Sequence, residues 1–354
     1  MNGMGVTNVF DKVLFVGPNC IHPKGGVAAV LHAYSKMFSP FLYVESTRGG
    51  GPFKLFFVFI KAFFIYLRYM CNSNIRIVHL HSASNGSFYR KGLLAIIAWL
   101  FRKKIVFHVH GGAFKEFSKR HGHIVHFVLS KSDAIVCLSE YWKDFFQNEL
   151  GFRHVYIIDN VIEKPYEDHS HRRDDLCSFL FLGKICNEKG IFDLIDVIAA
   201  YQEQLRGHFM LTIGGHGDIK RLISEINRTG INDMVEYVGF VDGDKKNQLF
   251  NECHALILPS YIEGVPITIL EAYSYHLPVI STNVGGIPQI LTNGKQGIVI
   301  SPGDKKNMLS AIQELVISPH KRGMYGNAGY DTCTKHLPES VKDELNKLYK
   351  LLIA

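Results

Sequence analysis

The fold is decided by one stretch, residues 258–290, which reads LPSYIEGVPITILEAYSYHLPVISTNVGGIPQI. Its apolar start predicts the end of a buried strand, and Pro266 predicts the first turn of a helix, where a proline loses no hydrogen bond. The free N–H groups of Ile267 and Thr268 would then lie at the positive end of the helix dipole. That arrangement suits the binding of a diphosphate.

Two glutamates flank this helix start, so each carboxylate could accept a hydroxyl, one from a ribose and one from a sugar. The setting S-x-x-E-G-x-P-x-x-x-x-E-A, followed by G-G-I-P at residues 285–288, resembles the retaining GT-B glycosyltransferases of family 4. The resemblance implies that Glu271 holds the nucleotide ribose and Glu263 lies beside the transferred sugar. The rest of the turn would contact the donor through Gly264, Val265, Pro266, Ile267 and Thr268. The alternative is an ordinary amphipathic helix with exposed carboxylates.

The composition is that of a globular protein long enough for two domains. The chain has 354 residues, of which 47% are hydrophobic and 20% are charged. Its net charge of +7 favours phosphorylated substrates or an anionic membrane over nucleic acid, because no nucleic-acid-binding motif accompanies it. The seven cysteines are scattered without a C-x-x-C pair, which predicts reduced thiols rather than disulfides or a zinc site. With no signal-peptide pattern at the N-terminus, we expect a cytoplasmic location.

The first half alternates predicted strands and helices, which indicates a parallel sheet covered on both faces. Its first strand, residues 12–17, is followed by a loop with Gly25 and Gly26, where backbone could approach an anion closely. This is not the G-x-G-x-x-G motif and is a weak signal alone. In the family that the chain resembles, a Gly-Gly loop at this place faces the diphosphate and the acceptor.

Residues 53–71 predict an aromatic, very apolar helix with Lys54, Lys61 and Arg68 at seven-residue intervals. Each of these charges would cost roughly 3 kcal/mol at the centre of a bilayer, so a membrane span is not expected. One interpretation is a crossover helix packed on the sheet with its basic stripe in water. The other is a helix whose outer apolar surface and basic residues lie on anionic lipid at the inner face of the cytoplasmic membrane.

Two predicted strands, residues 75–81 and 104–110, each end in H-x-H. Alternate residues of a strand point the same way, so each pair could chelate a metal, but no carboxylate or cysteine follows at ligand spacing. We therefore predict no metal. The resemblance instead places His110 beside the donor sugar, whereas the alternative is a histidine satisfied at a strand end.

The polar residues 163–175 predict a linker, after which the strand–helix pattern restarts. The family's G-R-x-x-x-x-K-G loop, whose two basic side chains grip the diphosphate, is matched here by Lys184 and Lys189. Because a lysine lacks the bidentate fork of arginine, the contact from Lys184 would differ from the family's. Glycine turns at Gly214 and at Gly239-Phe240 would let backbone approach the nucleotide. The Asp242-Gly243-Asp244 triplet precedes a helix pattern and predicts a cap and turn rather than a metal site.

Together these features predict the GT-B fold, with two facing Rossmann-like domains, parallel sheets and a central cleft. Residues 1–163 would bind the acceptor and residues 176–334 the nucleotide sugar, while residues 335–354 would form a helix returning to the first domain. The resemblance implies transfer of a sugar, with retention and without a metal, to a lipid-linked or polysaccharide acceptor. Such enzymes build bacterial O-antigen, lipopolysaccharide and capsule.

The donor is expected to be a UDP-sugar, the commoner one in this family, although no residue specifies the base. Three other classes stay open at this point. A GT-B enzyme that epimerises or hydrolyses the nucleotide sugar would need no acceptor, and a non-catalytic binding protein would show no turnover. A nucleic-acid-binding protein, suggested only by the net charge, would bind with a steep salt dependence.

Overall fold

The computed structural model describes residues 9–23, 25–165 and 176–354. The chain folds into two compact units. Unit 1 comprises Met1–Ile162 and His336–Ala354, and unit 2 comprises Glu163–Lys335. Most of the predicted linker, residues 166–175, lies outside the described residues.

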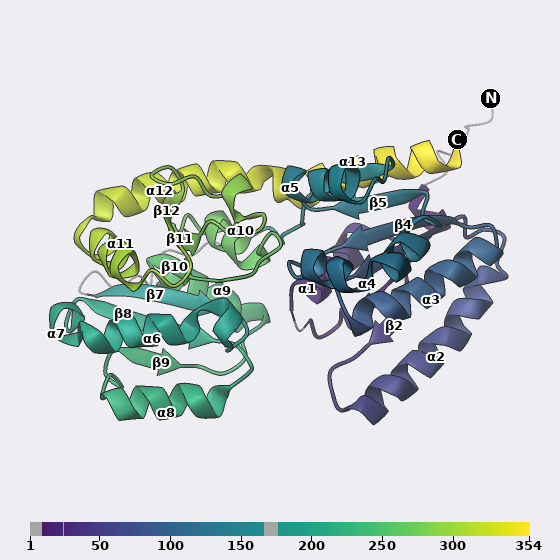
Figure 1. Cartoon of the computed structure of the whole chain (residues 1–354). Coiled ribbons are helices and arrows are strands. Elements are labelled where there is room, and N and C mark those ends of the chain that lie inside the picture. Colours follow the sequence, from purple (N-terminus) through teal and green to yellow (C-terminus); the bar gives the residue numbers. More distant parts are fainter. Residues whose placement is uncertain (1–8, 24, 166–175) are drawn as a thin grey trace. The chain divides into compact units, whose positions relative to one another are not determined.

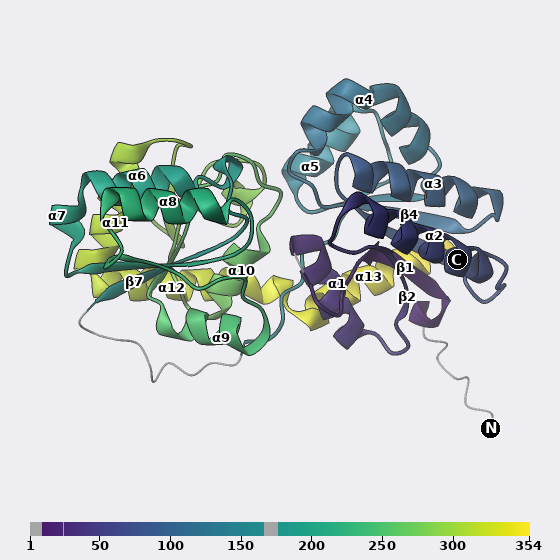
Figure 2. The same cartoon turned by 90° about the horizontal axis from the view of Figure 1, so that it is seen from below.

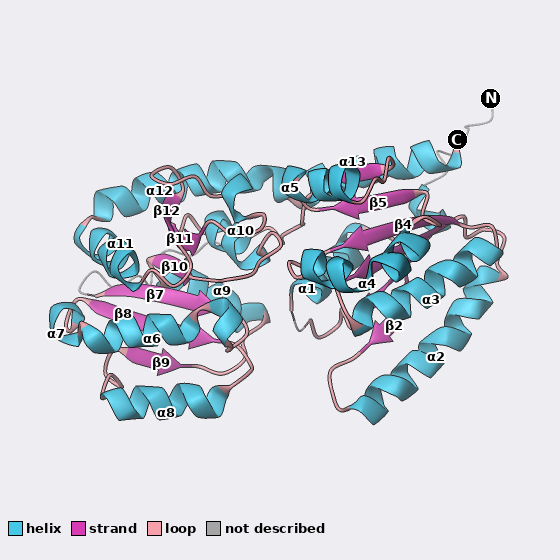
Figure 3. Ribbon diagram, in the orientation of Figure 1, coloured by secondary structure: helices cyan, strands magenta, loops and turns pink. Residues whose placement is uncertain are grey.

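Unit 1 is a parallel sheet in which strands and helices alternate along the chain (Figures 1 and 3). The sheet order is β2-β1-β3-β4-β5-β6, so the direction of winding reverses between β1 and β3. The elements are β1 (Val13–Pro18), α1 (Gly26–Met37), β2 (Leu42–Thr47), α2 (Pro52–Met70), β3 (Ile77–Ser82), α3 (Gly86–Leu100), β4 (Lys104–Val109), α4 (Phe114–Leu129), β5 (Ala134–Cys137), α5 (Glu140–Asp144) and β6 (Val155–Ile157).

The last helix of the chain, α13 (Pro338–Ile353), packs within unit 1 against α1 and β3. Its Tyr349 is fully buried, and the hydroxyl lies 2.5 Å from Nδ1 of His79 on β3. Glu344 of the same helix accepts a hydrogen bond from the backbone N–H of Asp159 at 3.4 Å. The C-terminal segment is therefore part of the core of the first unit, although it follows the second unit in sequence.

Unit 2 is also a parallel six-stranded sheet, with α6 and α8 on one face and α9 on the other (Figure 2). The order β12-β11-β10-β7-β8-β9 places the reversal of winding between β7 and β10, which is where such sheets bind ligands. The elements are β7 (Cys177–Leu182), α6 (Ile191–Ala200), α7 (Gln202–Leu205), β8 (Phe209–Gly214), α8 (Ile219–Thr229), β9 (Val235–Tyr237), α9 (Gly243–Glu252), β10 (Ala255–Leu258), α10 (Ile267–Ser274), β11 (Val279–Thr282), β12 (Gly297–Ile300), α11 (Lys305–Ile317) and α12 (Pro319–Cys333).

Helix α3 is longer than the sequence pattern predicts. The pattern places a loop up to residue 90 and a helix from Gly92, whereas the helix begins at Gly86. Gly92 is not a boundary, because a Cβ there would lie 3.0 Å from Cγ2 of Val128. The glycine instead lets α3 and α4 approach closely in mid-helix.

Helix α2 packs against the rest of unit 1 through a narrow row of buried side chains. Ala62, Tyr66 and Met70 are buried at four-residue spacing, and the Tyr66 hydroxyl donates to the carbonyl of Leu94 at 2.8 Å. The opposite surface is open: Phe53 is 84% exposed, and the further exposed apolar side chains are Phe56, Phe57, Ile60, Phe64 and Ile65. The three basic side chains of the predicted stripe, Lys54, Lys61 and Arg68, are exposed as well.

No helix within the described part of the chain combines the length and the hydropathy needed to cross a bilayer.

Candidate functional site

In unit 2 the loops that follow β7 and β10 meet at the switch point of the sheet. The backbone N–H of Tyr261 donates to the carbonyl of Glu188 at 2.9 Å. Gly190 has φ +69°, and a Cβ at this position would lie 2.0 Å from the carbonyl oxygen of Pro259. Only glycine lets these two loops approach so closely, and this contact fixes where the preceding Lys189 lies.

Lys189 and Glu263, both predicted site residues, form an ion pair at this place. The Lys189 ammonium donates to Oε1 of Glu263, and the Ser260 hydroxyl donates to the same oxygen at 2.8 Å. Glu263 is 8% exposed, so its carboxylate is held in one orientation by two donors, whereas Lys189 stays partly open to solvent. The geometry leaves the second oxygen of Glu263 as an acceptor for a ligand hydroxyl.

A pair of glycines after β11 holds the turn that carries Glu263. The N–H of Gly286 donates to the carbonyl of Gly264 at 2.6 Å. A Cβ on Gly285 would lie 2.0 Å from the carbonyl oxygen of Glu263, and one on Gly286 would lie 2.5 Å from Val265. The G-G-I-P motif therefore acts as a backbone support for the E-G-x-P turn.

Helix α10 begins beside this turn, one residue later than the sequence suggests. Pro266 is the N-cap residue with extended backbone (φ −70°, ψ 120°), not the first residue of the helix, because its carbonyl already accepts from the N–H of Ile269. No described residue accepts a hydrogen bond from the N–H of Ile267 or Thr268. Both N–H groups are therefore available to an anion.

Glu271 makes an ion pair that sequence reasoning missed. The ammonium of Lys246 on α9 lies 2.6 Å from Oε1 of Glu271. Burial lowers the pKa of Lys246, but the charge and hydrogen bond of Glu271, with smaller contributions from Glu163 and Asp242, outweigh it, so the net shift is upwards. No motif surrounds Lys246, and it lies 25 positions from its partner, so only the packing of α9 on α10 reveals the pair.

The other predicted contacts of unit 2 lie on loops at the carboxyl ends of its strands. Gly214 ends β8, and a Cβ there would lie 2.5 Å from Leu182. Gly239 has φ +82°, and Phe240 beside it is 38% exposed, with its ring centroid 5.8 Å from that of His216. Lys184 is exposed and forms no ion pair with a described residue. The Asp242-Gly243-Asp244 triplet lies at the start of α9, where Asp242 is the N-cap residue without a side-chain cap bond.

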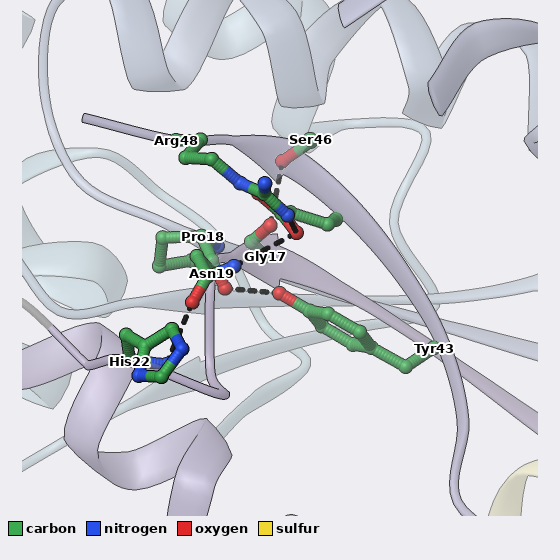
Figure 4. Close-up of polar contacts among 8 residues, drawn as sticks. Gly17, Pro18, Asn19, His22, Tyr43, Ser46 and Arg48 are labelled. Carbon is green, nitrogen blue, oxygen red and sulfur yellow. Dashed lines mark hydrogen bonds and ion pairs between the residues drawn. The ribbon is translucent and has the colours of Figure 1, made fainter. Parts of the chain in front are cut away.

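In unit 1 the start of the loop that leads to Gly25 and Gly26 is hydrogen-bonded to β2 (Figure 4). The Tyr43 hydroxyl donates to the carbonyl of Pro18, and the Asn19 amide donates to Glu45 at 2.9 Å. Arg48 holds the same carboxylate through two hydrogen bonds of 2.6 and 2.7 Å. The network fixes the start of the loop at the sheet edge, and Gly25 takes the φ of +96° that favours glycine.

His110 belongs to a stack of four imidazoles at the end of β3 and β4. Its Nε2 lies 2.9 Å from Nδ1 of His81, and Nε2 of His79 lies 3.1 Å from Nδ1 of His108. Burial lowers the pKa of His110 to about 3 and the pKa values of His79, His81 and His108 well below their usual range. His110 is therefore neutral at physiological pH and can act as a hydrogen-bonding partner, not as a cation.

One nitrogen from each of His79, His81 and His108 lies within 4.8 Å of the others. The His79 ring is nearly parallel to those of His81 and His108, with interplanar angles of 18° and 21°, and the rings of His81 and His108 are tilted by 36° to each other. Metal ligands need lone pairs that converge on one point, whereas the lone pairs of stacked rings run side by side. The geometry favours a column of neutral imidazoles.

The close approach at Gly190 makes a testable prediction about stability. Replacing Gly190 by alanine should lower the free energy of unfolding of unit 2 by about 3 kcal/mol or more, because it adds a steric clash to the cost of a positive φ. Gly230 provides the matched control, since it has the same φ of +69° and nothing within 4 Å of an added Cβ. Gly230→Ala should cost only about 1 kcal/mol. Equal losses in urea unfolding of the two variants would contradict the proposed contact.

Comparison with known proteins agrees with this architecture. The family description "Glycosyl transferases group 1" matches residues 166–332, and "Glycosyltransferase Family 4" matches residues 29–164. Among solved structures, sucrose-phosphate synthase from Thermosynechococcus elongatus superposes with a TM-score of 0.81 at 16% identity, covering 96% of this chain and 98% of that one. HepE of Anabaena in complex with UDP-glucose gives 0.76 at 16% identity, covering 96% and 99%. Two parallel α/β units of this kind define the GT-B fold.

The curated relatives align with a smaller part of this chain than the solved structures do. An uncharacterized glycosyltransferase of Methanocaldococcus jannaschii is 25% identical over 64% of this chain and 62% of its own length. The alpha-D-kanosaminyltransferase of Streptomyces kanamyceticus is 28% identical over 50% of this chain and 46% of its own. The matched stretch thus spans about half to two-thirds of such relatives. The chain belongs to the group 1 glycosyltransferases of the family 4 type.

Proposed function

We propose that this protein transfers a sugar from a nucleotide diphosphate sugar to a lipid-linked or polysaccharide acceptor, with retention of the anomeric configuration. The observation that carries the proposal is the pairing of Lys189 with Glu263 beside the open start of α10. It puts a cation, a fixed carboxylate and two free N–H groups at one edge of the unit 2 sheet. A nucleotide sugar offers the matching groups, namely a diphosphate and hydroxyls.

In the proposed reaction the bond between the anomeric carbon and the diphosphate oxygen breaks, and negative charge develops on the leaving phosphate. Lys189, Lys184 and the N–H groups of Ile267 and Thr268 stabilise that charge. Glu263 accepts a hydroxyl of the sugar, and neutral His110 offers a further hydrogen bond to it. The acceptor oxygen bonds to the anomeric carbon, while its proton passes to the departing phosphate. Preorganised donors of this kind contribute about 3–4 kcal/mol each in well-studied cases.

Glu271 is proposed to hold the ribose through the carboxylate oxygen that Lys246 leaves free. Several solved structures of the same fold contain UDP, including HepE with UDP and glucose and the pneumococcal transferase GtfA with UDP and GlcNAc. These complexes support UDP as the nucleotide here. The names of further relatives, amylovoran and capsular polysaccharide biosynthesis glycosyltransferases, support a polysaccharide product.

A thermal-shift panel of UDP-, GDP- and ADP-sugars tests the donor, followed by product analysis with and without added acceptor. We expect stabilisation by one UDP-sugar and turnover that needs an acceptor and survives EDTA. Loss of activity in EDTA with recovery in manganese would contradict the mechanism. Release of free sugar at the same rate with and without acceptor would contradict the transferase function.

A second part of the proposal is that α2 rests on an anionic membrane. Its exposed phenylalanines lie beside Lys54, Lys61 and Arg68, and these three basic groups are exposed too. The surrounding sequence adds to the charge, since residues 46–115 contain eleven Lys or Arg and no Asp or Glu. Apolar area together with basic groups is the combination that binds a lipid surface.

We therefore expect the wild type to co-sediment with vesicles that contain phosphatidylglycerol, and less so with neutral ones. Replacing Lys54, Lys61 and Arg68 by glutamate should reduce binding at least tenfold, because each basic group near the surface contributes about 1 kcal/mol. The matched control replaces the exposed Lys220 on α8 of unit 2 by glutamate, and this variant should bind the vesicles as the wild type does. Absence of the wild type from the vesicle pellet would refute the membrane contact.

A further inference from the structure

A lysine lies on the core-facing side of α3. Lys91 is 1% exposed and shares a helical stripe with Phe88, Leu94, Ala95 and Ala98, all of them fully buried. It forms no hydrogen bond or ion pair with a described residue. Burial lowers the pKa of Lys91 to about 7, and nearby Arg90 contributes in the same direction. A buried lysine without a partner is costly, so its place needs a reason.

The same helix start carries a second cation. A Cβ on Gly86, the first residue of α3, would lie 3.2 Å from Nη1 of Arg90, so the guanidinium folds back to the helix N-terminus. The Nε of Arg90 is buried and has no hydrogen-bond partner among the described residues. Side chains of a helix lean towards its N-terminus, so Lys91 also reaches in this direction.

These two cations lie at the end of the helix where the dipole is already positive, which is the unfavourable end for them. Asn85, the N-cap residue, makes no side-chain cap bond, and no described residue accepts from the N–H groups of Gly86, Ser87 or Phe88. The sequence offers no nearby counter-ion either, because residues 46–115 contain no Asp or Glu. The N–H groups of Gly86, Ser87 and Phe88 and the Nε of Arg90 are thus donors without an acceptor among the described residues.

The N-terminus of α3 lies at a place in the fold where parallel α/β sheets bind ligands. The winding of the unit 1 sheet reverses between β1 and β3, and α3 follows the carboxyl end of β3 after a short loop. His81, at the end of β3, lies close enough to Lys91 for the lysine charge to lower its pKa further, after burial and the neighbouring histidines. The Nε2 of His81 is buried and has no partner among the described residues.

We propose that Lys91, Arg90 and the first turn of α3 bind a phosphate or diphosphate group of the acceptor. The inference rests on the proposed transferase function and names the chemistry of the acceptor. A phosphate supplies the oxygens that two cations and three N–H groups require, and its double charge offsets both cations. Residues that lower stability while lacking a partner are typical of binding sites, where the ligand completes the arrangement.

Calorimetric titration with inorganic pyrophosphate tests the site in the full-length protein. We expect two binding events, one at the donor site of unit 2 and one at Lys91. Lys91→Met should weaken one event by about 10- to 100-fold, the loss expected for hydrogen bonds to a charged group. Lys189→Met should weaken the other event only, and Lys347→Met, which removes an exposed lysine of the same unit, should change neither.

The melting temperature of Lys91→Met should not fall, since an apolar chain of similar length replaces a buried cation. A loss of binding would therefore not reflect unfolding.

Titration with farnesyl diphosphate separates two sources of the phosphate. Binding at least tenfold tighter than that of pyrophosphate indicates a lipid carrier, and equal binding indicates a soluble phosphate ester. Wild-type affinity in both events for Lys91→Met would overturn the inference. A protein that binds no UDP-sugar but keeps the Lys91-dependent event would overturn only the donor assignment.

Discussion

Replacing Lys189 by methionine should lower kcat by about 10²- to 10³-fold, the loss found when one preorganised donor to a developing charge is removed. Lys189 is the one predicted diphosphate ligand that the structure fixes on both sides, by the glycine contact behind it and by Glu263 in front of it. Because the charge develops as the bond breaks, the loss should appear in kcat more than in KM. Steady-state kinetics with a UDP-sugar and its acceptor would measure both constants.

Two further variants separate the role of Lys189 from a merely structural one. Lys189→Met leaves the Glu263 carboxylate buried with Ser260 as its remaining donor, so some loss of stability is expected. The double variant Lys189→Met/Glu263→Gln removes that uncompensated charge and should recover the melting temperature without recovering kcat. Lys220→Met, a change of the same kind at an exposed site on α8, should keep full activity. Recovery of kcat in the double variant would contradict the proposed role.

The elements of the site were predictable because local chemistry dictates them. Alternation of apolar runs with helix patterns indicated two parallel sheets, and the glycines at 190, 285 and 286 mark the places where backbones must approach. Lys189 and Glu263, each predicted as a site residue, lie together, although 74 positions separate them. Motifs placed both at the ends of neighbouring strands, and the ends of neighbouring parallel strands meet at one edge.

Contacts made by side chains without a motif were not predictable. Lys246 meets Glu271 only because α9 and α10 flank the same strand, and nothing in its own neighbourhood marks it. The N-terminal half of α3 was missed because Gly86 and Gly92 look like breaks, whereas one begins the helix and the other packs on α4. That error left Lys91 between the predicted loop and the predicted helix, whereas in the structure it is a buried residue of α3.

The histidine stack predicts that unit 1 is unstable in acid. His79, His81 and His108 are fully buried, and burial lowers the pKa of each well below its usual range. The unfolded chain takes up their protons near pH 6.5, whereas the folded unit does not, so stability is full above that pH and falls as the pH drops below it. Between pH 7.5 and pH 5 each histidine should cost roughly 2 kcal/mol. His110, whose pKa burial lowers to about 3, is a fourth such group, and the four together equal the whole stability of an ordinary domain.

The two tryptophans, Trp99 and Trp142, both lie in unit 1, so their fluorescence follows this unit alone through urea titrations at several pH values. Below pH 6 the free energy of unfolding should fall by roughly 5 kcal/mol per pH unit, the slope for four histidines that each take up one proton on unfolding. His108→Asn should reduce the slope by about one proton, since asparagine does not titrate. A wild-type slope near zero between pH 6 and pH 5 would mean that the folded stack accepts protons. In that case His110 could not be assigned as a neutral hydrogen-bonding partner of the donor sugar.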